Sequence, residues 1–422
     1  MKQAKRKSKN NQASIQGNVI QLSFDKAQMV EMMQQQLHNH ALAMSLELVQ
    51  ALFTEEVERL CGVKHIHEER SHYRYGSQQG SVTINGSKHH IQKPRVRTKE
   101  GKEVALENYK LLKADDVMPT QCMERMVLGV STRNYRKVTQ AAAEGFGISR
   151  GSVSKHFISA SKKLVREFET RDLSQERYAV VMLDGQAYAG QMILAAIGIT
   201  EDGSKKVLGI IEGASENSEV VKDFLADLRE RGLSSENNTL FVIDGSKALR
   251  KGIKSVWGKR AFIMRCTVHK KRNLRGYVSE QHWPQVEKMY DDALKTTDFK
   301  EAHKRLTTLL RYLERISPSA HKSLKEAFAD LLTVKALGAG ELLEKTLSTT
   351  NPIESAFSVA RDAARNVKRW RKGDMRYRWA AAGMMSAEKS FNRIKGYKEM
   401  AGFVKRLDSA DIELLDQKAQ AA

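Results

Sequence analysis

Three acidic residues stand where an apolar strand should end or a helix should begin. Asp184 and Asp244 each follow a run of four apolar residues, and a glycine comes directly after each. Glu354 lies two residues after Pro352, which favours the first turn of a helix, with Asn351 as a candidate cap. Carboxylates at such positions stay close to solvent and can hold a metal ion. An Asp-Gly pair is also the commonest hairpin signal, so one such pair alone would indicate only a turn.

The elements around these acids should bring two of them together. A helix between two strands allows the second strand to run parallel to the first. If strand 239–244 pairs beside strand 178–184, Asp184 and Asp244 become neighbours at one edge of the sheet. About five residues separate Asp184 from the next strand, which is longer than the two-residue loop that Asp-Gly favours. The pattern predicts strands at about 178–184, 190–199, 205–212, 239–244 and 261–266, and helices at about 217–231 and 246–255.

Carboxylates that meet in this way favour divalent-metal chemistry. Neighbouring carboxylates repel each other and need a cation to stay ionised side by side. Oxygen ligands without a histidine cluster suit Mg²⁺ or Mn²⁺, and two ions about 4 Å apart could activate a water or a DNA 3′-hydroxyl and stabilise the leaving oxygen. Cys266 and His269 offer only one pair of zinc ligands, so we do not expect a structural zinc site.

The composition favours a polyanionic partner. The 422 residues are enough for two or three domains, and 71 basic against 50 acidic residues give a net charge of +21. Such an excess is typical of proteins that bind DNA or RNA. The few, widely spaced cysteines indicate no disulfide framework, and no apolar run is long enough to span a bilayer. We therefore expect a soluble cytoplasmic, nucleoid-associated protein with no membrane partner.

A helix-turn-helix is predicted between about 118 and 168. Residues 135–144 should form one helix and residues 146–148 a turn, and Ser149 is a good N-cap for a second helix. The first residues of such a second helix face base edges. The alternative is a helical hairpin that only packs. The candidate DNA contacts are Arg150, Ser152, Ser154 and Lys155.

A second basic region follows Glu354. Between Arg361 and Arg406 there are fourteen Lys or Arg residues against four acids, interleaved with Trp370 and Trp379. Arginines and lysines contact phosphates, and the tryptophans could either stack on an unpaired base or belong to the core. The candidate DNA contacts here are Lys368, Arg369, Arg371, Lys372 and Arg376.

Four stretches in one order resemble Mutator-type DDE transposases of bacterial insertion sequences, the insertion sequence 256 family. They are Leu183-Asp184-Gly185, Val242-Ile243-Asp244-Gly245-Ser246-Lys247-Ala248-Leu249, Arg265-Cys266-Thr267-Val268-His269-Lys270-Lys271-Arg272-Asn273-Leu274 and Thr349-Thr350-Asn351-Pro352-Ile353-Glu354. The resemblance covers roughly residues 100 to 400. The family often has an aromatic or basic residue after the first acid, whereas Gly185-Gln186-Ala187 stands here.

The resemblance implies a role for particular residues. Asp184, Asp244 and Glu354 would be the catalytic triad and would hold two Mg²⁺ or Mn²⁺ ions. Cys266 and His269 form a motif that the family carries near its active site, and we expect it, with Asn351, to support the site. The alternative for this pair is a core cysteine beside a phosphate-contacting histidine. Phosphate contacts are expected from His269, Lys270 and Arg272.

The expected architecture is a multidomain α+β protein. It has N-terminal helical and helix-turn-helix DNA-binding modules, a ribonuclease-H-like α/β catalytic core interrupted by an all-helical insertion, and a helical basic C-terminus. The predicted segments are a disordered basic tail (1–25), a helical and small β region for DNA binding or dimerisation (26–115), the helix-turn-helix domain (116–175), the first part of the core (176–270), the insertion (271–345), and the final core helices with the basic tail (346–422).

The expected function is DNA transposition. Such an enzyme binds the terminal inverted repeats of its element, hydrolyses a phosphodiester with Mg²⁺, and joins the freed 3′-hydroxyl to target DNA. Related transposases work as dimers, so we expect a homodimer on double-stranded DNA. Two alternatives remain open, namely a metal-dependent nuclease without strand transfer and a helix-turn-helix regulator with a non-catalytic central domain.

Overall fold

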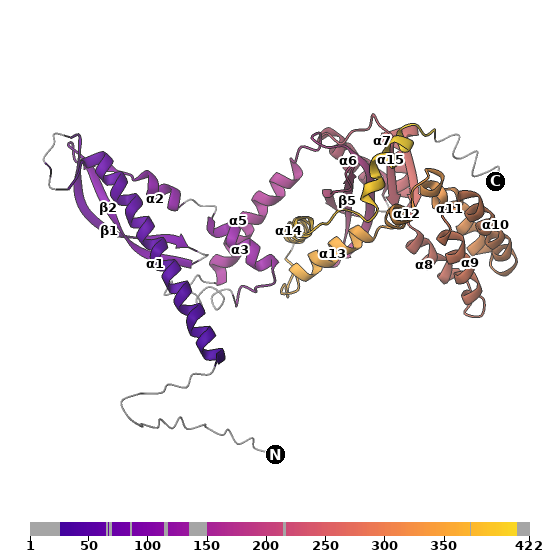
Figure 1. Ribbon diagram of the computed structural model, residues 1–422, viewed down its shortest axis with the longest axis horizontal. Coiled ribbons are helices and arrows are strands. Elements are labelled where there is room, and N and C mark those ends of the chain that lie inside the picture. Colours follow the sequence, from indigo (N-terminus) through magenta and orange to yellow (C-terminus); the bar gives the residue numbers. More distant parts are fainter. Residues whose placement is uncertain are drawn as a thin grey trace, which may run out of the picture. The chain divides into compact units, whose positions relative to one another are not determined.

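A computed structural model describes residues 26–64, 66, 70–84, 87–113, 117–134, 150–213, 217–371 and 373–411. The chain divides into two compact units of mixed helix and strand (Figure 1). The first comprises residues up to Cys122 together with 132–154, and the second comprises 123–131 and the residues from Lys155 onward. Within the described ranges no helix combines the length and apolar character needed to cross a membrane. The finer predicted domain limits stay predictions.

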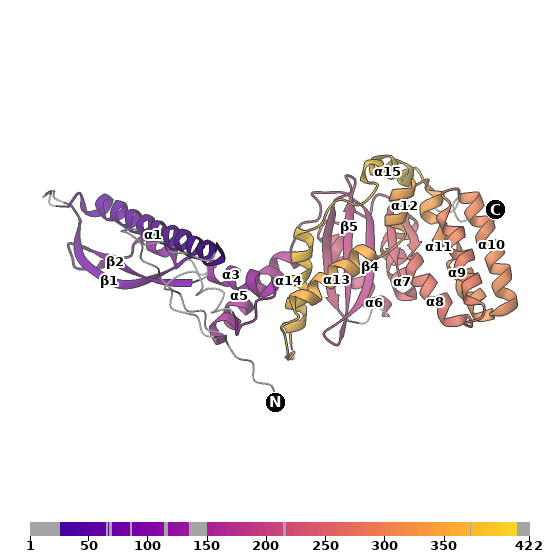
Figure 2. The ribbon, with the colours of Figure 1, turned by 60° about the horizontal axis from the view of Figure 1, so that its bottom comes forward.

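The first unit packs one long helix on a small antiparallel sheet. Its core joins successive turns of α1 to the inward residues of β1 and β2, and Figure 2 shows α1 lying along the sheet. The helical part of the region predicted at 26–115 thus begins with a single helix over residues 26–61. Its elements are α1 (Lys26–Cys61), β1 (His72–Ile84), β2 (Ser87–Thr98), β3 (Glu103–Val104) and α2 (Glu107–Leu112).

Among the residues that the structure describes, two further helices come before the central sheet. They are α3 (Val117–Val127) and α5 (Arg150–Glu169). The second helix of the predicted helix-turn-helix is therefore present, and it begins at Arg150. The predicted first helix at 135–144, the turn at 146–148 and Ser149 lie outside the described residues, so the helix-turn-helix itself stays a prediction.

A five-stranded mixed sheet organises the second unit. The strand order is β6-β5-β4-β7-β8, with β4, β5 and β6 antiparallel and with β7 parallel to both β4 and β8. The predicted parallel pairing of the first and fourth strands of this region is confirmed. The strands are β4 (Tyr178–Tyr188), β5 (Gln191–Thr200), β6 (Lys205–Glu212), β7 (Thr239–Ile243) and β8 (Ala261–Arg265).

The sequence pattern predicted that the first strand of this sheet ends at Asp184, and this prediction is wrong. β4 continues for four residues, Asp184 pairs with Ala195 of β5, and the turn comes at Ala189 and Gly190, both with positive φ. The reason is that β5 satisfies the backbone of β4 beyond the point where the ladder with β7 stops. The last β4–β7 pair joins Leu183 to Ile243. Asp184 therefore lies inside a strand.

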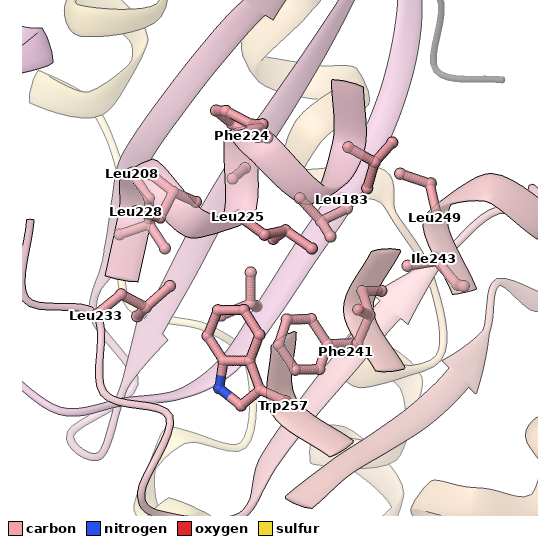
Figure 3. Packing of buried hydrophobic residues seen from close by; sticks show 14 of the residues in the cluster. Leu183, Leu208, Phe224, Leu225, Leu228, Leu233, Phe241, Ile243, Leu249 and Trp257 are labelled. Atoms are coloured by element: carbon pink, nitrogen blue, oxygen red, sulfur yellow. The ribbon is translucent and has the colours of Figure 1, made fainter. Parts of the chain in front are cut away.

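Opposite faces of this sheet carry different helices. Side chains alternate along a strand, and Leu183 belongs to the core under α6 (Ser218–Glu230) and α7 (Lys247–Trp257), as Figure 3 shows. Asp184 must then point to the other face. There α13 (Asn351–Ala363) packs against β4 and β5, and the Tyr188 hydroxyl donates to the Ala360 carbonyl at 3.3 Å.

A block of helices connects β8 to α13. These helices share their own core, and α11 also packs against β8, so the block is joined to the sheet. The predicted helical stretch at about 271–345 is confirmed. The block consists of α8 (Thr267–Tyr277), α9 (Trp283–Lys295), α10 (Phe299–Ile316), α11 (Pro318–Ala336) and α12 (Glu341–Leu347).

The chain after α13 returns to the sheet. Helices α14 (Met375–Lys389) and α15 (Met400–Asp408) complete the second unit. α14 crosses α13 at close range, because a Cβ on Gly383 would come within 2.5 Å of the Ala360 Cα. This contact fixes the helix that carries Glu354.

Candidate active site

Asp184 is a buried carboxylate on the α13 side of the central sheet. Only 1% of its surface is exposed, and the Gln186 side-chain amide donates to its Oδ2 at 3.0 Å. A buried charge normally needs a partner or a metal. The position of Asp184 inside β4 also fixes its direction, since pairing with Ala195 of β5 restrains the backbone.

Asp244 lies directly after β7, next to Asp184. Both acids follow the last parallel pair, Leu183 with Ile243, so they occupy adjacent places across the two strands. The Oδ1 of Asp244 accepts the backbone N–H groups of Gly245 at 2.5 Å and Ser246 at 2.9 Å. These bonds hold the side chain in a turn and leave Oδ2 for another ligand.

Glu354 reaches the same region from the first turn of α13. The N-cap of this helix is Thr350, and Asn351 is its first residue, which corrects the predicted cap at Asn351. Glu354 Oε1 lies 3.6 Å from His269 Nε2 and 3.7 Å from Arg272 Nη1, both on α8. A carboxylate in the first helical turn is also favoured by the helix dipole.

Ligand atoms from three of these residues form one cluster. One oxygen each of Asp184 and Glu354 and one ring nitrogen of His269 all lie within 4.8 Å of one another. Asp244 stands beside this set and is not one of its members. The sequence predicted all three acids as metal ligands, and two of them belong to this cluster. It placed His269 in a supporting position, whereas the structure brings a ring nitrogen of His269 into the cluster itself.

Burial dominates the electrostatics of Asp184. It raises the pKa of this carboxyl from 3.8 to about 6; Gln186 and His269 lower it, and the neighbouring charges of Asp244 and Glu354 raise it further. A hydrogen bond with Cys266 raises the pKa of His269 to about 9, with additional attraction from Asp184 and Asp244. At neutral pH a protonated His269 therefore offsets part of the negative charge in the cluster.

Replacing Asp184 by asparagine should stabilise the metal-free protein at neutral pH. Because the pKa of Asp184 is higher in the folded than in the unfolded chain, its ionisation costs folding free energy, fully above pH 6 and not at all below pH 3.8. The shift corresponds to up to about 3 kcal/mol. Asp184→Asn should raise the free energy of unfolding towards that amount at pH 7.5 in EDTA and change it little at pH 4.

Asp202 supplies the control for this prediction. A hydrogen bond from Thr200, followed by bonds from Ser204, lowers the pKa of Asp202 to about 2, so its ionisation stabilises the fold. Asp202→Asn should therefore change stability in the opposite direction at pH 7.5. If Asp184→Asn instead destabilises the metal-free protein at that pH, burial does not govern the charge of Asp184.

Thr350 links the two segments that deliver His269 and Glu354. Its fully buried hydroxyl lies 3.6 Å from Cys266 Sγ and 3.4 Å from His269 Nδ1, and the Thr267 N–H donates to the Ser348 carbonyl. Burial alone would raise the pKa of Cys266, but the hydrogen bonds with His269 and Thr350 lower it. The sequence pattern did not predict this role of Thr350, although its place directly before Asn351-Pro352 marks it as a candidate cap.

One predicted DNA contact is wrong. Lys270 is only 2% exposed, and its amine donates to the carbonyl at 3.0 Å and to the hydroxyl at 3.1 Å of Ser323 on α11. It is therefore directed into the helical block and away from solvent. His269 and Lys270 are consecutive residues of a helix, so their side chains point to different sides of α8.

The other predicted DNA contacts have varied environments. On α5, Arg150, Ser154 and Lys155 are exposed and Ser152 is half-buried. Arg272, Lys368, Arg369 and Arg371 are exposed, and Lys372 lies outside the described residues. Arg376 is half-buried, and its Nε donates to the Ala189 carbonyl at 3.0 Å.

The two tryptophans of the basic region differ in burial. Trp379 is buried and stacks on Phe157 with ring centroids 4.3 Å apart. Trp370 is half-buried and meets Tyr188 edge-on at 5.9 Å. For Trp379 the core alternative is confirmed, and stacking on a base is excluded by its burial.

Comparisons with known proteins agree on one class. A family model described as "Transposase, Mutator family" matches residues 18–387. The chain is similar to the transposase for insertion sequence element IS256 in transposon Tn4001 from Staphylococcus aureus, with 26% identity over 68% of this chain and 74% of that protein. It is also similar to the transposase for insertion sequence element IS1081 from Mycobacterium tuberculosis, with 25% identity over 68% of this chain and 70% of that protein. A third similar protein is the transposase for insertion sequence element ISRM5 from Rhizobium meliloti, with 28% identity over 51% of this chain and 54% of that protein.

Proposed function

Because the chain belongs to the Mutator family of transposases, we propose that it cuts and joins DNA at the ends of an insertion sequence by metal-dependent phosphodiester chemistry. The observation that carries this proposal is the convergence of Asp184, Glu354 and His269 within 4.8 Å, with Asp244 on the adjacent strand. These residues are separated by up to 170 positions in the sequence and come from β4, the end of β7, α8 and α13. Asp184, Asp244 and Glu354 would be the catalytic acids.

The sheet supports a ribonuclease-H-like core. Three antiparallel strands followed by two parallel ones, with the first acid on β4 and the second after β7, place both acids at the middle of the sheet. The helical block between β8 and α13 would be the insertion in that core. The third acid then comes from the first helix after the insertion, which covers the face towards which Asp184 points.

The donor set fits Mg²⁺, and Mn²⁺ as a substitute. Carboxylate oxygens of Asp184, Asp244 and Glu354 would hold the metal, and hard oxygen ligands are what Mg²⁺ prefers. The carboxylate of Asp184 supports this fit, because burial first, and then the charges of Asp244 and Glu354, raise its pKa, and a bound cation would favour the ionised form. A bound pair of such ions supplies an activated oxygen nucleophile and stabilises the leaving oxygen.

The chain's own residues would orient the reacting phosphate. Asp244 is held by two backbone N–H groups that bind its Oδ1, which leaves Oδ2 for a ligand on the strand next to Asp184. His269 and Arg272 lie close to Glu354 and offer positive charge at neutral pH. A phosphodiester placed there would be held by cationic donors on α8 while the acids hold the metal.

Binding of DNA ends would use the basic surfaces. Arg150, Ser154 and Lys155 lie at the exposed start of α5, where a second helix of a helix-turn-helix presents its readers. Lys368, Arg369 and Arg371 would contact phosphates without reading sequence. The substrate is then double-stranded DNA carrying the terminal inverted repeats, the enzyme works as a homodimer, and it resides with the nucleoid of a bacterium.

Cleavage of native ends tests the proposal. The full-length protein is incubated with Mg²⁺ and a duplex that carries the flanking ends of its element, and new 3′ ends are mapped at nucleotide resolution. We expect a cut at the element end, followed by joining of that 3′-hydroxyl to a second duplex. Hydrolysis without joining would identify a nuclease, and binding without any cut under Mg²⁺ or Mn²⁺ would contradict the proposal.

A further inference from the structure

Helix α1 carries two separate apolar faces. One packs on the small sheet through Val49, Phe53 and Val57, which are all buried. The other faces solvent. This second face, the α1 stripe, consists of Met33, Leu37, Ala41, Met44, Leu48 and Leu52, and the exposed fractions of its larger side chains are 66%, 73%, 64%, 66% and 39% in that order.

The α1 stripe is a continuous surface with no cover among the described residues. At 3.6 residues per turn its centre lies about 150° around the helix from the face on the sheet, and its 20 positions extend about 29 Å. The α1 residues that pack in the core of the first unit begin at Leu46, and Figure 1 shows the N-terminal part of α1 running past the small sheet. A row of exposed Met and Leu side chains of this length marks an interaction site.

The charge of α1 identifies the kind of partner. No lysine or arginine occurs between Lys26 and Arg59, whereas five glutamates do, although the whole chain has a net charge of +21. Such a segment repels phosphates, which argues against DNA. It also lacks the basic polar face of helices that lie on anionic membranes. The remaining partner is an apolar surface of a protein.

The spacing of the stripe points to a second copy of this chain. Successive stripe residues are separated by 4, 4, 3, 4 and 4 positions, which reads the same in both directions. A twofold axis between Ala41 and Met44 then matches every stripe residue with an apolar residue of the other copy, as an isologous interface requires. Met33 would lie against the partner's Leu52, and Leu37 against the partner's Leu48.

We propose that two copies of this protein associate through antiparallel pairing of their α1 stripes. A parallel pairing is disfavoured because Glu55 continues the stripe at its C-terminal end, so that the two copies of Glu55 would meet. The antiparallel pairing separates them and leaves each small sheet on the outer side of its own helix. The interface does not depend on the acidic cluster, so it can be tested without catalysis.

Substitution of Leu37 tests the interface. Leu37→Glu places a charge within the stripe at a position that is 73% exposed, so folding of the chain is unaffected. The wild-type protein should have twice the 47.6 kDa chain mass by light scattering at 10 µM, and Leu37→Glu should run at the chain mass. Ala43→Glu adds the same charge to an exposed position outside the stripe and should remain dimeric.

Cross-linking tests the direction of pairing. In a Cys61→Ser background, Leu37→Cys and Leu48→Cys variants are oxidised separately and as a mixture. The antiparallel arrangement predicts a cross-linked dimer only in the mixture, whereas a parallel one gives a dimer with Leu37→Cys alone. The proposal is overturned if the wild-type protein is monomeric, if Leu37→Glu remains dimeric, or if the parallel pattern is found. A monomeric protein that still cuts DNA ends would refute the interface and leave the proposed chemistry intact.

Discussion

Replacing Asp244 by asparagine should reduce Mg²⁺-dependent cleavage of the element ends by about 10³-fold or more, the range found when a charged group of a catalytic centre is neutralised. Asparagine keeps the shape of the side chain, and its oxygen can still accept the backbone N–H groups of Gly245 and Ser246. The turn at the end of β7 therefore survives, and only the negative charge is lost. Single-turnover cleavage of a labelled duplex measures the effect.

Binding of the DNA ends separates a chemical defect from a structural one. Asp244→Asn should bind the end duplex with wild-type affinity in a mobility-shift assay, because Asp244 does not belong to the basic surfaces that are proposed to bind the DNA. The same pattern is expected for Asp184→Asn and for Glu354→Gln. Asp223→Asn, an exposed acid on α6, serves as the matched control and should cleave normally. Full cleavage by Asp244→Asn would remove Asp244 from the proposed triad.

The position of Asp184 next to Asp244 on two parallel strands was predictable from local sequence patterns and one rule of sheet topology. Apolar runs located the strands, and the helix between them required a crossover that allows parallel pairing. The end of β4 was not predictable from the same information. Its extension past Asp184 depends on pairing with β5 as far as Tyr188 and Gln191. An Asp-Gly pair inside a strand looks identical, in sequence, to one at a turn.

The surroundings of the acids could not be derived from the sequence, because they depend on contacts between distant segments. Thr350 meets Cys266 and His269 across more than 80 positions. Lys270 looked like a surface lysine in a basic run, and its burial becomes visible only once α11 is in place. The same holds for Trp379, whose basic neighbours suggested a nucleic-acid contact although Phe157 covers its ring.

A buried ionic network joins the helical block to the strand beside Asp244. Arg265, the last residue of β8, is almost fully buried; its Nη2 lies 2.8 Å from Glu326 Oε1 and 3.7 Å from Asp330 Oδ2, both on α11. Arg250 on α7 also pairs with Asp330. Burial raises the pKa of Asp330, against the lowering effect of these two arginines. The network therefore depends on its cations to keep a buried carboxylate ionised.

Replacing Arg265 by leucine should lower the free energy of unfolding by about 3 kcal/mol, the lower end of the cost of breaking a buried ion pair, because the buried Asp330 loses one of its two arginines and keeps Arg250. Arg305→Leu removes an exposed pair with Glu301 one helical turn away and should cost about 0.5 kcal/mol or less. Urea titration of the full-length protein compares the two variants. A cost for Arg265→Leu no larger than that for Arg305→Leu would show that the network contributes nothing to stability.

The loss of Arg265 should also affect the acidic site, because this arginine supports the turn after β7. A Cβ on Gly245 would come within 2.5 Å of Arg265 Nη1, and the Cys266 N–H donates to the Ile243 carbonyl at 2.8 Å. Gly245 in the turn that orients Asp244 packs against the guanidinium of Arg265, and this contact is lost in the leucine variant. Arg265→Leu should therefore require several-fold more Mg²⁺ for half-maximal cleavage under conditions where it remains folded, and Arg305→Leu should not. An unchanged Mg²⁺ requirement in the folded variant would limit Arg265 to a role in stability.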